Sequence, residues 1–240
     1  LLYYDWNMEK IKIFYDGADL NYITSNREKY IDGVTTNPSI MKKAGITNFE
    51  KFSKELIQII PDKPVSLEVF SDDIDEMKRQ ALKINEWGEN IYVKIPITNS
   101  EGLSTKLLIH ELLEEGVKLN ITAVFTLEQV KNIGECFSEH PKNIISIFCG
   151  RIADTGTNPQ LILKSINEYK DSNNLPIDIL WASAREIYNL KQAQESNCQI
   201  ITLGEDLISK IKNFDKSLEV FSLETVEMFK NDAVEVGYKI

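Results

Sequence analysis

Cysteine and histidine are scarce in this chain of 240 residues, which contains three of the first and two of the second. Cys136, Cys149 and Cys198 are widely spaced and form no CxxC pair, so we expect reduced thiols rather than a disulfide framework. His110 and His140 do not have the spacing of a metal site. We therefore expect neither a structural metal nor a cofactor.

The chain also lacks an excess of basic residues and any long hydrophobic run. Its 27 Lys and Arg residues against 37 Asp and Glu leave a formal net charge of -10. This charge argues against nonspecific binding to nucleic acid or to an anionic membrane, because both need a basic surface. No apolar stretch approaches the roughly 20 residues of a membrane span, and no signal peptide precedes a cleavage site. We expect a cytoplasmic protein without nucleic-acid or membrane partners.

Strand-like segments alternate with amphipathic helical segments along nearly the whole chain, which is typical of repeated βα units around a parallel sheet. Ser71 to Glu86 shows a 3.6-residue apolar stripe, and Thr126 with Gln129 has the pattern of a capping box. The eight predicted strands are Ile11 to Asp16, Gly33 to Asn37, Pro64 to Phe70, Asn90 to Pro96, Leu119 to Val124, Ile144 to Gly150, Asp178 to Ser183 and Gln199 to Leu203.

The predicted fold class is α/β, a single (β/α)8 TIM barrel over residues 11–240 with an additional C-terminal helix over Ser222 to Tyr238. Barrels of this class commonly occupy this length as one domain. Residues 1–10 are interpreted as an N-terminal extension outside the fold. An open doubly wound sheet is the alternative, but no glycine-rich phosphate loop follows the first strand.

The polarity of alternate residues predicts which face of each strand points into the barrel. In the fifth strand Asn120, Thr122 and Val124 share one face, whereas Ile121 and Ala123 share the other. In a closed parallel barrel the apolar set contacts the helices and the other set points inward. Polar residues near the C-terminal ends of the strands would then form the floor of a catalytic mouth.

Lys94 stands out because it lies in the apolar run from Asn90 to Pro96. A lysine in a dehydrated pocket has its ammonium form disfavoured, and the free amine becomes available as a nucleophile toward a carbonyl carbon. Schiff-base chemistry is therefore the first hypothesis. The alternative is a lysine at a strand end whose head reaches water.

Seven of the eight predicted strands end in polar residues that suit a site. They are Asp16, Asn37, Glu68, Lys94, Asn120 with Thr122, Ser146 with Arg151, and Ser183 with Arg185. Several have a structural alternative: Asp16 as a helix cap before Ala18, Asn37 before Pro38 as turn chemistry, and the two arginines as surface charges. Glu68 needs a partner or a function, because a carboxylate on an inward strand face is costly.

With these residues the chain resembles the transaldolase family, specifically its short subfamily that includes fructose-6-phosphate aldolases. The resemblance runs from about Lys12 to the C-terminus. The matching motifs are Phe14-Tyr15-Asp16, Gly33-Val34-Thr35-Thr36-Asn37-Pro38-Ser39, Val93-Lys94-Ile95-Pro96, Asn120-Ile121-Thr122, Ser146-Ile147-Phe148-Cys149-Gly150-Arg151 and Ala182-Ser183-Ala184-Arg185.

The resemblance implies an aldol mechanism on sugar phosphates without a metal, with Lys94, Asp16, Glu68 and Thr122 as catalytic residues. Lys94 would attack the C2 ketone of a ketose phosphate, and Asp16 would take the proton of its C4 hydroxyl. Glu68 and Thr122 would relay protons through a water. The substrate-binding residues would be Thr36, Asn37, Asn120, Ser146 and Phe148 around the sugar, and Arg151, Ser183 and Arg185 at the phosphate. The resemblance also suggests a homo-oligomeric ring of subunits.

Three positions bear on whether the enzyme transfers or releases the three-carbon unit. The resemblance suggests Glu68, Asn120 and Phe148 for transfer, against Gln, an apolar residue and Tyr for release. The sequence therefore favours a transaldolase of the pentose phosphate pathway over an aldolase that releases free dihydroxyacetone. A noncatalytic sugar-phosphate binder is a third hypothesis. Ala184 replaces an aromatic residue that many relatives carry, which leaves the acceptor sugar open.

Overall fold

The computed structural model describes residues 11–140 and 143–240, so the extension predicted for residues 1–10 lies outside the described residues. Parallel strands form a closed barrel in chain order, and β8 pairs with β1. This confirms the predicted (β/α)8 barrel and excludes an open sheet. The strands are β1 (Lys12–Asp16), β2 (Gly33–Thr35), β3 (Val65–Glu68), β4 (Ile91–Pro96), β5 (Leu119–Val124), β6 (Asn143–Ile147), β7 (Ile177–Trp181) and β8 (Ile200–Leu203).

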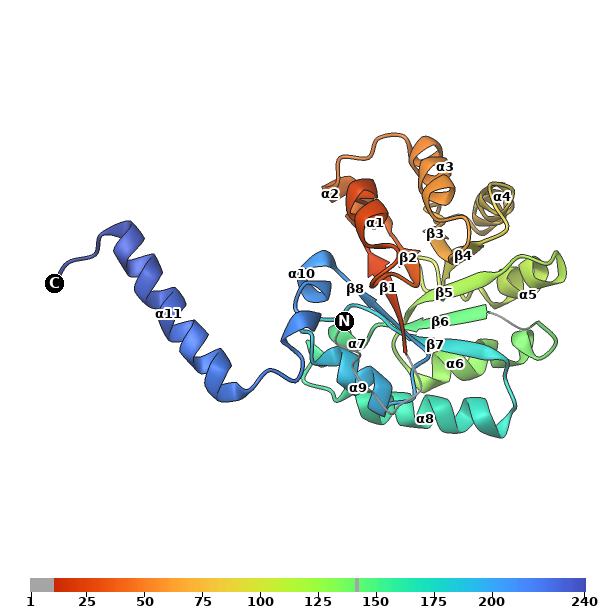
Figure 1. The fold of residues 1–240 in the computed structure, drawn as a ribbon. Helices are drawn as coiled ribbons and strands as arrows, with labels where there is room; N and C mark the ends of the chain where they lie inside the picture. Colours follow the sequence, from red (N-terminus) through yellow and green to blue (C-terminus); the bar gives the residue numbers. More distant parts are fainter. Residues whose placement is uncertain (1–10, 141–142) are drawn as a thin grey trace. The chain divides into compact units, whose positions relative to one another are not determined.

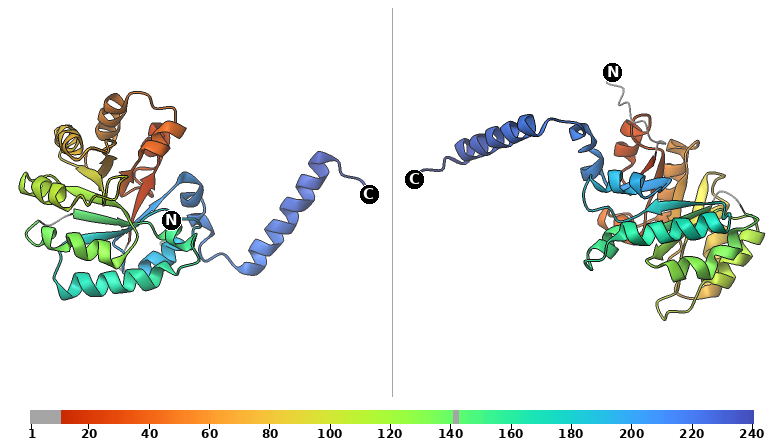
Figure 2. Two further views of the ribbon diagram at one scale, coloured as in Figure 1. Left: turned by 180° about the vertical axis from the view of Figure 1, so that it is seen from behind. Right: turned by 90° about the horizontal axis from the view of Figure 1, so that it is seen from below.

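Helices surround the barrel strands on the outside, as the view along the barrel shows (Figure 1) and the views from behind and below repeat (Figure 2). They are α1 (Leu20–Asn26), α2 (Pro38–Lys43), α3 (Phe49–Ile59), α4 (Ile74–Asn85), α5 (Lys106–Glu114), α6 (Leu127–Gly134), α7 (Cys149–Ala153), α8 (Pro159–Ser172), α9 (Asn189–Glu195) and α10 (Glu205–Ile208), with the 3-10 turn η1 (Glu135–Phe137) after α6.

Short polar side chains set the point at which many of these helices begin. Thr126 accepts from the backbone N–H of Gln129 and the Gln129 side chain accepts in return, which confirms the predicted capping box before α6. Asn158 caps α8, and Pro159 supplies its first residue. Capping side chains of the same kind precede α1, α2, α3 and α4: Asp19, Asn37, Asn48 and Asp73.

One strand departs from the predicted alternation of faces. Ile121 pairs with Ile145 and Val124 with Ile147, so β5 advances three positions where β6 advances two. The extra residue is accommodated at Ala123, whose φ of 58° lies in the left-handed region that costs a residue with a Cβ. The predicted alternation, which grouped the last residue of this strand with the polar set, is therefore wrong beyond the bulge.

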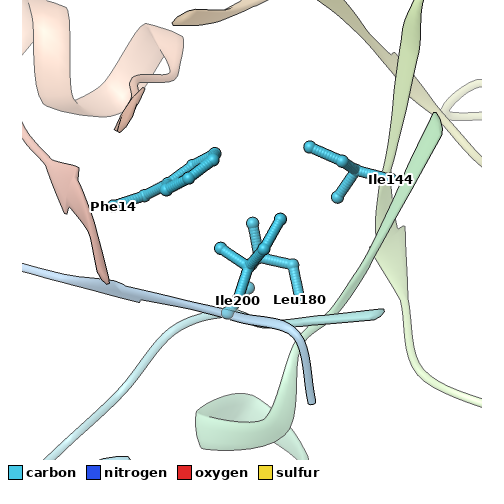
Figure 3. Packing of buried hydrophobic residues seen from close by; sticks show 5 residues of the cluster. Phe14, Ile144, Leu180 and Ile200 are labelled. Atoms are coloured by element: carbon cyan, nitrogen blue, oxygen red, sulfur yellow. The ribbon is translucent and has the colours of Figure 1, made fainter. Parts of the chain in front are cut away.

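An apolar cluster fills one part of the barrel interior. Phe14, Ile144, Leu180 and Ile200 come from β1, β6, β7 and β8, and their side chains point toward one another (Figure 3). Phe148 packs against this cluster as a partly buried side chain. Inward-facing residues of a small barrel form a packed core rather than a pore, so the cluster closes the interior beneath the polar residues of β1 and its neighbours.

The described chain separates into two compact units, residues up to Ile208 and residues Ser209–Ile240. The first unit contains the barrel. The second contains the 3-10 turn η2 (Ile211–Asn213) and the helix α11 (Leu218–Val236), which corresponds to the additional C-terminal helix predicted from the sequence. The single-domain boundary of 11–240 stays a prediction. Among the described residues, no helix has both the length and the apolarity to cross a membrane.

Candidate active site

Lys94 projects into the barrel beside Glu68, its register neighbour on β3. The Lys94 Nζ atom lies 2.9 Å from Glu68 Oε2 and donates to the backbone oxygen of Thr36 at 2.9 Å. The lysine side chain is 7% exposed and the glutamate side chain 19%. This burial excludes a lysine that reaches bulk water, and the ion pair provides the partner that each charge needs away from water.

Asp16, at the end of β1, accepts a hydrogen bond from a hydroxyl group of the neighbouring strand β2. Thr35 Oγ1 on β2 donates to Asp16 Oδ1 at 2.9 Å, and it also shares a hydrogen bond with Thr202 Oγ1 on β8. Asp16 does not cap the following helix. That position belongs to Asp19, whose carboxylate accepts from the N–H of Asn21 at 2.8 Å.

A second buried chain of hydrogen bonds fixes the amide of Asn120. Its Nδ2 atom donates to Ser66 Oγ at 3.0 Å, and its Oδ1 atom accepts from Ser146 Oγ at 2.7 Å. These contacts link β3, β5 and β6 and assign the two ends of the amide. Thr122 on β5 is also buried, but its Oγ1 atom has no hydrogen-bond partner in the described part of the chain. An unpaired buried hydroxyl costs about 1–3 kcal/mol, so Thr122 has a donor and an acceptor available for a ligand.

The loop after β2 brings Thr36 and Asn37 to the same region. The Asn37 Oδ1 atom accepts from the N–H of Ile40 at 3.0 Å and caps α2, so Asn37 has a structural role at the start of a helix. Asn37 nevertheless lines the central cavity. Thr36 contributes its backbone oxygen to Lys94, whereas its buried Oγ1 atom has no partner among the described residues.

Gly150 controls how the loops after β6 and β7 approach each other. A Cβ atom built at this position would lie 1.5 Å from the backbone oxygen of Ser183, so only glycine fits. Ser183 itself has a φ of 63°, a costly conformation for a non-glycine residue. The close contact places the start of α7, which carries Arg151, against the end of β7.

The two arginines occupy different positions in this region. Arg151 lines the cavity and is exposed at its rim. Arg185 does not line it. The side chain of Arg185 forms an ion pair with Asp154 at the surface, and its backbone N–H donates to Asn189 Oδ1 at 2.7 Å. Arg185 therefore lies next to the site with its guanidinium engaged by a carboxylate.

A single cavity at the C-terminal ends of the strands collects most of these side chains. Eight of the predicted residues line it: Asp16, Asn37, Lys94, Thr122, Ser146, Phe148, Arg151 and Ser183. Glu68, Thr36 and Asn120 lie directly beside this lining through their contacts with Lys94 and Ser146. Sequence reasoning missed Thr35 and Thr202, which also line the cavity, and Ser66, which holds Asn120. Thr35 and Ser66 lie in predicted strands at positions that the alternation of faces places inside the barrel. This alternation is the sequence signal that identifies them as candidates for the site.

The electrostatic environment raises the pKa of Asp16 above the ordinary value of an aspartate. Burial is the largest cause, and the neighbouring Glu68 carboxylate adds to the rise. The Lys94 ammonium and the hydrogen bond from Thr35 act in the opposite direction, because both stabilise the carboxylate. A carboxyl group with a raised pKa is suited to accept a proton near neutral pH.

The described residues contain no group of three or more His, Cys, Asp and Glu side chains placed to hold a metal ion. The absence of a metal or cofactor from the reaction stays a prediction. The groups that the cavity does offer are an amine, carboxylates, hydroxyls, an amide and a guanidinium. Their convergence at the C-terminal face of a parallel barrel is the arrangement found in barrel enzymes.

Comparisons with known proteins identify the enzyme family. The family model described as Transaldolase/Fructose-6-phosphate aldolase matches residues 13–240. A probable transaldolase 2 of Listeria monocytogenes is 36% identical over 215 residues, which cover 88% of this chain and 94% of that protein. A probable transaldolase of Streptococcus agalactiae is 33% identical over 224 residues, 92% of this chain and 99% of that protein. The chain therefore belongs to the Transaldolase/Fructose-6-phosphate aldolase family.

Solved structures of low identity show the same barrel. A thiamine phosphate pyrophosphorylase from Pyrococcus furiosus aligns with a TM-score of 0.56 at 10% identity, covering 82% of this chain and 87% of that chain. The structure described as native KDPGal aligns with a TM-score of 0.53 at 14% identity, covering 84% and 86%. At these identities the likeness extends to the fold alone.

The raised pKa of Asp16 is open to direct measurement by carboxyl-carbon NMR. We expect Asp16 to titrate above the ordinary value of about 3.9. Lys94→Met should raise the pKa further, because it removes the positive charge that stabilises the carboxylate. The control is Lys78→Met, which removes a lysine paired with Glu111 on the outer helices and should leave Asp16 unchanged. An ordinary pKa in the unmodified protein would contradict the burial argument.

Proposed function

We propose that this enzyme is a transaldolase that forms a Schiff base through Lys94 and transfers a dihydroxyacetone unit from fructose 6-phosphate or sedoheptulose 7-phosphate to an aldose phosphate. The observation that carries the proposal is the buried Lys94 to Glu68 pair in a cavity that also holds Asp16. The family and its relatives support the reaction class.

In the first step Lys94 attacks the C2 ketone of the ketose phosphate. The ammonium must lose a proton before it attacks, and the Glu68 carboxylate 2.9 Å away is the acceptor in contact with it. Formation and breakdown of the carbinolamine exchange protons with water, and the unpaired Thr122 hydroxyl is placed in the cavity to hold that water. Loss of water leaves an iminium ion, which draws electrons from the bond that will break.

In the second step Asp16 takes the proton of the C4 hydroxyl, and the bond between C3 and C4 breaks. The electron pair passes into the iminium ion, so the dihydroxyacetone unit stays on Lys94 as an enamine while an aldose phosphate leaves. Asn120, with its amide fixed by Ser66 and Ser146, and Asn37 hold the hydroxyls of the retained unit. Thr36 and Phe148 complete its surroundings. The enamine then adds to the aldehyde of an acceptor aldose phosphate, and the same steps run in reverse to release the new ketose phosphate.

The phosphate group would lie at the rim, where Arg151 is exposed and Ser183 is close by. Arg185 would join them by leaving Asp154 for the phosphate, because a doubly charged oxyanion competes well for a guanidinium fork. The side chain of Arg185 lies near Gly150, which precedes Arg151 in the chain, and this position supports phosphate binding over a role as a surface charge alone.

A release-type aldolase is the second candidate, because the family contains both activities in its description. The cavity favours transfer: the carboxylate of Glu68 and the fixed amide of Asn120 supply polar contacts that retain the enamine, and Phe148 offers no acidic hydroxyl to protonate it. A noncatalytic binder would have no need for a buried amine paired with a carboxylate.

A homo-oligomeric ring is part of the proposal. Residues Ser209–Ile240 form a unit of their own, in which α11 carries Leu218, Phe221, Leu223 and Phe229 as exposed apolar side chains. So small a unit cannot bury such side chains in a core of its own, which favours burial against another surface.

We also propose that the enzyme acts in the pentose phosphate pathway in the cytoplasm. The reducing conditions of the cytoplasm suit the free thiols of the described chain.

Covalent trapping tests the nucleophile. Borohydride reduction in the presence of fructose 6-phosphate should attach a three-carbon unit to Lys94, because reduction makes the Schiff base permanent. Peptide mass mapping locates the label. Lys94→Ala should remain unlabelled, whereas Lys164→Ala, which removes an exposed lysine of α8, should be labelled like the unmodified protein. Folded protein that takes up no label would rule out the Schiff-base mechanism.

The assignment of Arg185 to the phosphate predicts that Arg185→Ala selectively weakens the use of phosphorylated substrates. Its KM for fructose 6-phosphate should rise about 10- to 100-fold, the value of a hydrogen bond to a charged group. Turnover of unphosphorylated fructose, measured in the same assay, should change little. Asp154→Ala is the matched control, because it removes the other half of the ion pair and should not raise KM. An unchanged KM in Arg185→Ala would end the assignment.

Transfer and release differ in what accumulates. With fructose 6-phosphate alone, we expect free dihydroxyacetone to form much more slowly than glyceraldehyde 3-phosphate forms once erythrose 4-phosphate is added. The retained enamine has no acceptor in the first case and one in the second. Coupled enzymatic assays of both products measure the ratio. Equal rates with and without the acceptor would favour the release-type aldolase.

A further inference from the structure

Thr202 occupies an inward position on β8, and none of the reaction steps proposed above gives it a role. The residue is 5% exposed, and its Oγ1 atom is hydrogen-bonded to Thr35 Oγ1 on β2. Thr35 in turn donates to Asp16 Oδ1 at 2.9 Å. Since β1 lies between β8 and β2 in the barrel, the two threonines reach each other across β1, and Thr35 connects Thr202 to the carboxylate of Asp16.

The direction of this hydrogen-bond chain follows from the number of hydrogens available. Each threonine hydroxyl has one hydrogen, and an ionised carboxylate can only accept. The Thr35 hydrogen therefore points at Asp16, and Thr35 Oγ1 must accept the hydrogen of Thr202. A second acceptor for Thr202, the backbone oxygen of Phe14, lies at 3.4 Å and is the weaker one. The chain runs from Thr202 through Thr35 to Asp16.

We propose that Thr202 is a positioning residue for the general base: by donating to Thr35, it keeps the Thr35 hydrogen on one oxygen of Asp16 and leaves the second oxygen to accept the proton of the substrate hydroxyl. The inference rests on the proposed function of Asp16. Hydrogen bonds in series polarise one another by perhaps 10–30% per bond, so Thr202 strengthens the bond that Thr35 makes to the carboxylate.

A purely packing role for Thr202 is the competing explanation, and the chemistry of the position argues against it. Valine has nearly the same shape and fills buried strand positions without burying a hydroxyl, which costs free energy unless it is bonded. The hydroxyl of Thr202 donates its hydrogen to Thr35, although the backbone oxygen of Phe14 is also within hydrogen-bond distance. The charged groups that act on Asp16 are Lys94 from β4 and Glu68 from β3, and neither is bonded to Thr202.

The test compares Thr202→Val, which keeps the volume and loses the hydroxyl, with Thr202→Ser, which keeps the hydroxyl. The measurements are kcat/KM for fructose 6-phosphate cleavage across pH, and borohydride trapping at Lys94. We expect Thr202→Val to lower kcat/KM about 2- to 10-fold, the value of one hydrogen bond, and to move its acidic limb to higher pH, because the carboxylate loses stabilisation. Trapping should persist, and Thr202→Ser should keep both the rate and the profile.

A double replacement isolates the route through Thr35. In a Thr35→Val background the chain to Asp16 is already broken, so adding Thr202→Val should produce no further shift of the acidic limb. A further shift as large as in the unmodified background would overturn the inference. An unchanged profile in Thr202→Val alone, or an equal loss in Thr202→Ser, would also overturn it. In each of these cases trapping at Lys94 leaves the proposed function standing, whereas failure of trapping in the unmodified protein removes both.

Discussion

The ion pair between Lys94 and Glu68 is the constraint around which the barrel interior is arranged. Two charges that are 7% and 19% exposed need each other, because a single buried charge left without its partner costs about 3–5 kcal/mol. An apolar pair of similar volume would often be at least as stable. The fold therefore gains little from keeping these two residues, and the chemistry of an amine held beside a proton acceptor is the better reason for their presence.

Burying this pair requires a polar lining, and the barrel supplies it through side-chain bonds between neighbouring strands. Ser66, Asn120 and Ser146 form one chain of such bonds, and Thr202 and Thr35 form another that ends on Asp16. A fully bonded polar network is stable inside a protein, whereas a partly bonded one is not. Two of the buried hydroxyls without a partner among the described residues belong to this region: Thr122 lines the cavity, and Thr36 donates no hydrogen bond from its side chain although its backbone oxygen contacts Lys94.

The barrel and the meeting of Lys94, Glu68 and Asp16 can be predicted from the sequence, because alternating polarity reports strand faces and all strands of a parallel barrel present their C-terminal ends together. The pairing of Thr35 with Thr202 cannot, since it joins residues 167 positions apart through a register that depends on barrel closure. The bulge at Ala123 is also beyond a period-2 pattern, which carries no signal for an inserted residue.

The structure separates the proposed chemistry from the proposed recognition of phosphate. The amine and its carboxylates lie on strands, whose positions the ladder of backbone hydrogen bonds fixes on both sides. The arginines lie beyond the strand ends, on α7 and after β7, where Ser183 adopts a costly φ and Gly150 leaves room for its backbone oxygen. Backbone strain of this kind persists only where the surroundings enforce it. The strained residue lies in the loop after β7, at the proposed phosphate site, whereas Lys94 lies within the regular strand β4.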